Sequence, residues 1–142
     1  MQINEAIKNI KSLNDLKTVV ESYGVKLKSE KEQIKGLCPF HKEKTPSFYL
    51  KDDVDGAFYK CFGCGRGGDI VKFIREIEQT PTLEATKKAY EILGLKCDLK
   101  PSKLDNLRNY IETNKFYKID NYYIEDIFVY MVDIDIPSFL KI

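Results

Sequence analysis

The first apolar residues that recur at helical spacing lie near the N-terminus. They fall three and four residues apart, between a Ser that can cap a helix and a Gly that can end one. These apolar residues are Leu16, Val19, Val20 and Tyr23, between Ser12 and Gly24. The pattern predicts a helix over residues 13–23.

The following segments change to the alternating period of strands. Residues 25–28 and 34–37 alternate in polarity around a charged turn, which predicts a short hairpin. Residues 46–51 and 57–61 are rich in aromatic side chains and flank the turn at 52–56, which predicts a second hairpin. We therefore expect a small antiparallel sheet.

Two more helices are predicted after Gly68. Asp69 can cap a helix that buries Phe73 and Ile74 and ends before Pro81. Thr82 is expected to cap the next helix, which ends at Gly94 and directs Leu83, Ala89, Tyr90 and Leu93 inward. Strands lying between helices predict an α+β fold.

The composition changes near Lys96, and we expect two parts: residues 1–96 form the main domain, and residues 97–142 form a small C-terminal extension. Within the extension, a capping box at Ser102 predicts a short helix. Residues 122–136 are rich in β-branched and aromatic side chains and favour a strand, which is a candidate for docking to a partner.

Charge and hydropathy exclude few classes of function. Residues 1–96 carry 17 Lys and Arg against 14 Asp and Glu, a balance too even to indicate a nucleic-acid partner. The longest apolar run, residues 127–132, is far shorter than the roughly 20 residues of a membrane helix. The N-terminus also lacks the pattern of a secretory signal, so we expect a cytoplasmic protein with no membrane partner.

Two pairs of metal-binding residues have the spacing of zinc knuckles. Cys38 and His41 are separated by two residues, as are Cys61 and Cys64. Four protein ligands leave no coordination position for water, so the pattern predicts one structural zinc ion. One alternative is that the cysteines are buried thiols and His41 a surface residue, which the specific paired spacing disfavours. The other is a redox pair at Cys61 and Cys64, which would leave the upstream pair unexplained. Cys97 is expected to be an ordinary packed or surface thiol.

The residues around these knuckles resemble the zinc-binding domain of bacterial replicative DNA primases. The similarity lies in Gly-Leu-Cys-Pro-Phe-His-Lys-Glu-Lys-Thr-Pro-Ser-Phe from Gly36 and in Tyr-Lys-Cys-Phe-Gly-Cys-Gly-Arg-Gly-Gly-Asp-Ile from Tyr59, and extends over residues 10–96. The resemblance implies a zinc ribbon, packed against helices, that binds single-stranded template for a catalytic domain. In this family that domain is a Toprim domain, with a Glu and an Asp-x-Asp pair that hold Mg²⁺.

The one Asp-x-Asp pair outside the ribbon, Asp133 and Asp135, lies close to the end of the sequence. We therefore expect a non-catalytic protein, not an enzyme, that acts in trans with a catalytic primase or helicase-primase subunit.

Alternation along the second hairpin predicts a face for single-stranded DNA. If Phe48, Leu50 and Tyr59 face the helices, the other face carries aromatic rings for stacking and cations for phosphates. The predicted DNA-binding residues are Lys35, Lys44, Tyr49, Lys51, Phe58, Lys60 and Arg66. The turn at 52–56 holds three Asp residues where members of the family usually carry a Lys, which argues against a contribution of this turn to DNA binding.

Two other functions compete with DNA binding. A zinc-stabilised protein-interaction module could use the ribbon or residues 122–136 to dock on a replication, transfer or transcription protein. A minimal primase or nuclease is disfavoured, because the sequence offers no open metal site and no carboxylate cluster in a cleft.

Overall fold

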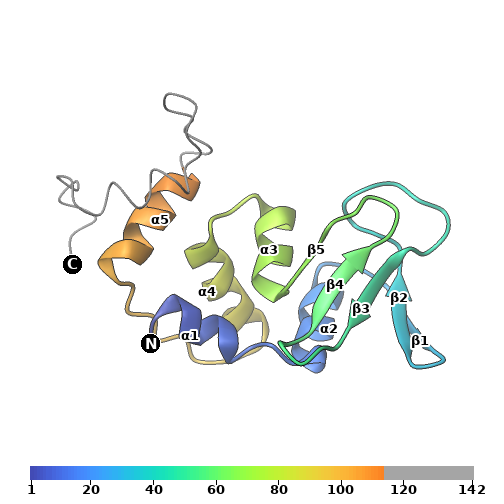
Figure 1. Cartoon of the computed structure of the whole chain (residues 1–142), viewed down its shortest axis with the longest axis horizontal. Helices are drawn as coiled ribbons and strands as arrows, with labels where there is room; N and C mark the ends of the chain where they lie inside the picture. Colours follow the sequence, from blue (N-terminus) through green and yellow to red (C-terminus); the bar gives the residue numbers. More distant parts are fainter. Residues whose placement is uncertain (114–142) are drawn as a thin grey trace.

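The computed structural model describes residues 1–113, and an antiparallel sheet occupies one end of this part (Figure 1). Its strands lie side by side in chain order and form one meander. They are β1 (Leu27–Glu30), β2 (Gln33–Gly36), β3 (Phe48–Lys51), β4 (Phe58–Cys61) and β5 (Gly67–Gly68). Both predicted hairpins are confirmed, because β1 pairs with β2 and β3 pairs with β4.

Helices fill the rest of the described structure. They are α1 (Ile3–Lys8), α2 (Leu13–Ser22), α3 (Ile70–Glu78), α4 (Thr82–Ile92) and α5 (Lys103–Thr113). α2 contacts β3 and α3 contacts β5, so these two helices lie next to the sheet, while α1, α4 and α5 lie farther away (Figure 1). The α+β fold is confirmed. Within residues 1–113, no helix combines the length and the apolar character needed to cross a bilayer.

Side-chain caps start three of the helices as the sequence predicts. At α5 the predicted capping box forms, because the Asp105 N–H donates to the Ser102 hydroxyl at 3.1 Å and the Ser102 N–H donates to the Asp105 carboxylate at 2.9 Å. The Ser12 hydroxyl accepts a hydrogen bond from the Asp15 N–H at 3.1 Å, and the Asp69 carboxylate accepts one from the Lys72 N–H at 2.9 Å. The predicted cap at Thr82 is wrong. Pro81 occupies the cap position without a side-chain bond, and the Thr82 hydroxyl donates to the Glu112 carboxylate at 2.8 Å. Thr82 therefore ties α4 to α5.

The core forms where the sheet meets α2 and α3. Phe48, Leu50 and Tyr59 are buried, as alternation along the strands predicts. Phe73 from α3 packs edge-on against Tyr59, with ring centroids 5.4 Å apart. The ring of Phe40, from the loop between β2 and β3, lies 5.5 Å from that of Phe73. One aromatic cluster thus connects a helix, the sheet and this loop.

The sequence pattern did not predict α1, which has only six residues. Ile3 and Ala6 are its buried side chains, and the Tyr90 hydroxyl of α4 donates to the Ala6 carbonyl at 2.8 Å. A helix of this length would not be stable in isolation, so contacts with α4 stabilise it. The strand predicted at 122–136 and the Asp133–Asp135 pair lie outside the described residues.

Candidate metal centre

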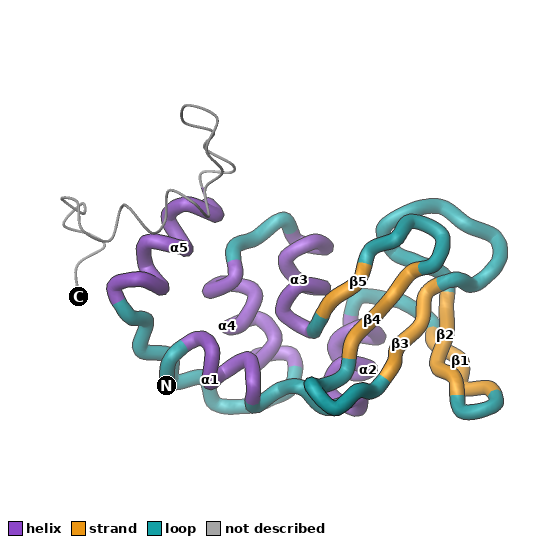
Figure 2. Tube along the Cα trace, in the orientation of Figure 1, coloured by secondary structure: helices purple, strands orange, loops and turns teal. Residues whose placement is uncertain are grey.

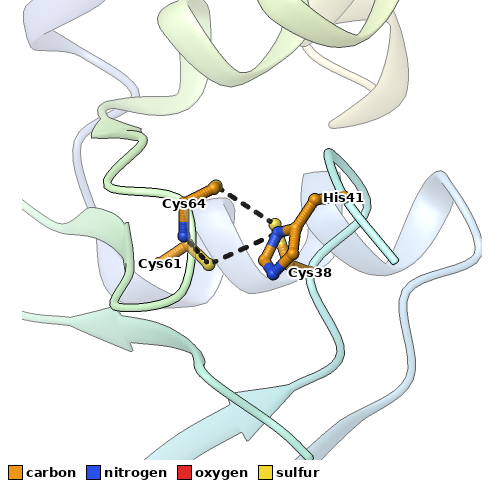
Figure 3. Close-up of side chains that lie close together, drawn as sticks. All are labelled: Cys38, His41, Cys61 and Cys64. Carbon is orange, nitrogen blue, oxygen red and sulfur yellow. Dashed lines mark hydrogen bonds between the residues drawn. The ribbon is translucent and has the colours of Figure 1, made fainter. Parts of the chain in front are cut away.

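Two connections at the same end of the sheet supply the four predicted ligands (Figure 2). Cys38 and His41 belong to the long loop between β2 and β3, whereas Cys61 ends β4 and Cys64 follows in the turn to β5. β3 and β4 are hydrogen-bonded neighbours, with Phe48 paired to Cys61, which fixes the distance between the two connections. Figure 3 shows the four side chains converging.

The distances within this group fit a zinc ion. The four ligand atoms lie within 4.8 Å of one another. The Cys38 and Cys64 Sγ atoms are 3.8 Å apart, and Cys61 Sγ is 3.8 Å from His41 Nδ1. Tetrahedral zinc, with sulfur at about 2.3 Å and nitrogen at about 2.0–2.1 Å, places neighbouring ligand atoms about 3.6–3.8 Å apart. The set Cys38, His41, Cys61 and Cys64 therefore forms a single structural zinc site.

The pKa values of two of the ligand thiols, Cys38 and Cys61, shift in opposite directions. Burial raises the pKa of the Cys38 thiol to about 12. Burial also tends to raise the pKa of Cys61, but hydrogen bonds from the Ser47 hydroxyl and the Cys64 and Gly63 N–H groups outweigh it and lower that pKa to about 7. The Cys64 N–H lies 3.4 Å from Cys61 Sγ, and the Phe40 N–H lies 3.4 Å from Cys38 Sγ. Backbone groups within each knuckle thus stabilise its first thiolate.

Glu43 is a residue of this site that the sequence analysis missed. Its carboxylate lies 2.9 Å from His41 Nε2 and accepts hydrogen bonds from the Ser47 N–H at 2.9 Å and the Cys38 N–H at 3.3 Å. The Ser47 hydroxyl also donates to it. The Ser47 hydroxyl foremost, and then these N–H groups and His41, hold the Glu43 pKa below its usual value although burial opposes them. Its place two residues after a His ligand was the available signal.

Two cations close to the zinc site, Lys60 and Arg66, contact groups other than the ligands. Lys60 donates to the Gly65 carbonyl at 2.9 Å. Arg66 pairs with Glu76 at 3.0 Å, and its guanidinium carbon lies 4.9 Å from the centre of the Phe40 ring. Arg66 therefore fastens the first knuckle to α3.

The face of the sheet opposite the helices contains most of the predicted DNA-binding residues. Lys35, Tyr49 and Lys60 are direct cross-strand neighbours on β2, β3 and β4, and Lys51 is paired with Phe58. Tyr49, Phe58 and Lys60 are half-buried and Lys51 is exposed. We call these five residues, with Phe62, the open face. Lys44 and Arg66 are exposed in the two knuckle connections, outside this row.

Phe62 is the residue of the open face that the sequence analysis did not include. It follows Cys61 directly and is 62% exposed, the largest exposed fraction of any described aromatic side chain. Its ring packs edge-on against Tyr49 at 5.5 Å between centroids, and Lys51 Nζ lies 5.4 Å from its centre. The alternation that exposes Phe58 and Lys60 could have identified it.

Comparison with known proteins connects this structure to DNA primases. The chain is 38% identical over 111 residues to the "DNA primase" of Clostridium acetobutylicum, an alignment that covers 78% of this chain and 17% of the relative. It is 40% identical over 98 residues to the "DNA primase" of Borreliella burgdorferi, covering 69% and 18%. The crystal structure of the Aquifex aeolicus primase, with its zinc-binding and RNA polymerase domains, superposes with a TM-score of 0.56 at 34% identity, covering 74% of this chain and 25% of that one.

These relatives correct the expectation that the protein is not an enzyme. The relatives are DNA primases, and the matched module occupies less than a fifth of the first two. The matched domain is thus one part of each of these relatives, and the residues of this part do not determine whether the whole protein is an enzyme. The expectation of a non-catalytic protein was therefore wrong, since it took the properties of one module for those of the protein.

The family assignment rests on most of the chain. The model of the CHC2 zinc finger matches residues 2–104, which include all four ligands and the described structure from α1 to the start of α5. The chain therefore belongs to the CHC2 zinc-finger family of bacterial DNA primases.

Proposed function

We propose that this domain binds single-stranded DNA template on its open face and presents it to the RNA polymerase domain of a primase. The observation that carries the proposal is the exposed Phe62 ring beside Tyr49, flanked by Lys51 and the Lys35–Tyr49–Lys60 row. Flat exposed rings stack on unpaired bases, and neighbouring lysines neutralise the phosphates between them.

The present contacts of these lysines are weak enough for phosphate to replace. Lys35 pairs with Glu30 at 3.2 Å on the surface, and Lys60 binds a single carbonyl. A surface ion pair contributes about 0–1 kcal/mol, so exchanging it for a phosphate costs little. Lys44 adds an exposed positive charge in the loop between β2 and β3, whereas Arg66 would first have to leave its ion pair with Glu76.

Phe62→Ala tests the stacking surface. Stacking on one ring contributes about 1–3 kcal/mol per base, so the variant should bind single-stranded DNA about 5- to 150-fold more weakly while keeping its zinc. Fluorescence anisotropy with a labelled oligonucleotide measures this affinity. Leu104→Ala, a change at an exposed apolar residue of α5, is the control and should bind as wild type. Unchanged binding by Phe62→Ala would contradict the proposed face.

Lys60→Ala tests the phosphate contacts. Affinity for single strands falls as salt rises, and each lost phosphate contact makes the slope of log affinity against log salt less steep by about 0.7. Lys87→Ala on α4 removes the same charge from a helix that does not contribute to the open face and should leave the slope unchanged. Equal slopes for both variants would contradict this assignment. Absence of DNA binding at any salt would instead favour the protein-interaction module.

We also propose that this domain can act in trans, from a chain separate from the RNA polymerase domain of the primase. This proposal has its own test. The 142-residue chain is added to a primase RNA polymerase domain that has no zinc domain of its own, and primer synthesis on single-stranded template is measured. We expect stimulation that Phe62→Ala reduces. Failure to stimulate despite intact DNA binding would remove only the proposal that the module works from a separate chain.

A further inference from the structure

Glu43 makes four polar contacts beside the zinc site. It lies in the loop between β2 and β3, and its side chain is only 10% exposed. One carboxylate oxygen faces His41 Nε2 and the Ser47 hydroxyl, and the other accepts the N–H groups of Cys38 and Ser47. All four groups facing the carboxylate can donate a hydrogen bond.

An ionised carboxylate suits this surrounding because it only accepts hydrogen bonds and has about four lone-pair positions. An amide of the same shape has one accepting oxygen and an NH₂ group that would face donors. The arrangement therefore requires the charge of Glu43 as well as its shape.

The contact with His41 has a consequence for the metal. A neutral imidazole carries its hydrogen on one ring nitrogen and offers a lone pair on the other. Here Nε2 is 2.9 Å from Glu43, while Nδ1 faces the Cys61 sulfur at 3.8 Å. A hydrogen on Nε2 satisfies the carboxylate and leaves the Nδ1 lone pair for zinc.

We propose that Glu43 is a positioning residue that fixes the Nε2–H tautomer of His41, so that Nδ1 is the nitrogen that binds zinc. Histidines that bind metals commonly donate their second N–H to a carboxylate, which orients the ring and makes it a better ligand. The inference concerns the metal site and does not depend on DNA binding.

Ser47 extends the influence of Glu43 to the second knuckle. Glu43 binds both the N–H and the hydroxyl of Ser47, whose oxygen lies 3.5 Å from Cys61 Sγ. The space around these groups is closed, because a Cβ added at Gly63 would lie 2.7 Å from His41 Nε2 and 2.8 Å from Ser47 Oγ. The His41 ring and the Ser47 hydroxyl therefore lie between the Glu43 carboxylate and the Gly63 backbone.

Glu43→Gln in the 142-residue chain is the main test. Loss of such a carboxylate weakens metal binding by about 10- to 100-fold, and competition with a chelator measures the change. Glu84→Gln is the control, because the contact of Glu84 within residues 1–113 is an exposed pair with Lys87 at 4.0 Å on α4. The control should bind zinc as wild type. Zinc affinity of Glu43→Gln within twofold of wild type would overturn the proposal.

A second measurement reports on the ring itself and needs no variant. His41 is the only histidine in the sequence, so its two nitrogens can be assigned without ambiguity in a ¹⁵N NMR spectrum of the zinc-loaded protein. We expect a protonated Nε2 and a metal-bound Nδ1 in wild type, with faster exchange of the Nε2 proton in Glu43→Gln. A wild-type protein that binds zinc through Nε2 would overturn the proposal even if the variant failed to fold.

Discussion

Replacing Phe73 by Ala should be among the most destabilising single changes in the described domain. Phe73 is fully buried on α3, and its ring lies 5.4–6.1 Å from those of Phe48, Tyr59, Phe40 and Tyr23. Truncating a buried Phe to Ala costs about 3–5 kcal/mol, because the apolar contacts are lost and the cavity closes only in part. Domains of this kind have about 5–15 kcal/mol of stability, so the variant loses a large share.

A second substitution separates the ring contacts from simple burial. Phe73→Leu keeps much of the apolar volume but removes the aromatic pairs, so it should destabilise the domain, though less than Phe73→Ala. Urea unfolding of the zinc-loaded proteins, followed by far-UV circular dichroism because the chain has no Trp, measures both. Leu95→Ala, at an exposed position, should change stability by less than about 0.5 kcal/mol. If Phe73→Ala matched that control, the aromatic cluster would not hold the domain together.

Three further results are expected from the same structure. Purified protein should contain one zinc per chain, and a strong chelator should lower its melting temperature sharply, since structural zinc sites contribute about 10–16 kcal/mol to folding; unchanged melting after metal removal would contradict this. Gly36→Ala should lower the free energy of unfolding, because its Cβ would lie 2.6 Å from the Lys26 carbonyl, and calorimetry showing equal stability would refute the close approach. Glu112→Ala should cost about 1–3 kcal/mol, because it leaves the buried Thr82 hydroxyl and N–H unpaired, and Glu91→Ala on the exposed side of α4 is its control.

The sequence predicted the features that depend on local pattern. α2 and α3 have both a helical apolar period and a capping residue, so Ser12 and Asp69 were identified before the structure. The four ligands were identified because each knuckle has a spacing that zinc coordination requires. The inward residues of β3 and β4 were identified because alternation is a property of the strand itself.

The features that the sequence did not predict depend on contacts between distant segments. α1 forms because α4 covers it, and β5 is a pair of glycines that carries no strand pattern. Thr82 was expected to cap its own helix but binds Glu112, thirty residues away. Glu43 was overlooked because its importance comes from four donors that only the folded loop brings together.

The metal and the open face are linked by two consecutive residues. Cys61 is the last residue of β4 and is buried at the zinc site, and Phe62 follows it in the turn with its ring exposed beside Tyr49. The Phe62 N–H donates to the Ser47 carbonyl at 2.9 Å, and Ser47 is held by Glu43, which also holds His41. A displacement of either knuckle therefore moves Phe62 relative to Tyr49. Removal of zinc is therefore expected to change the geometry of the exposed rings through the backbone.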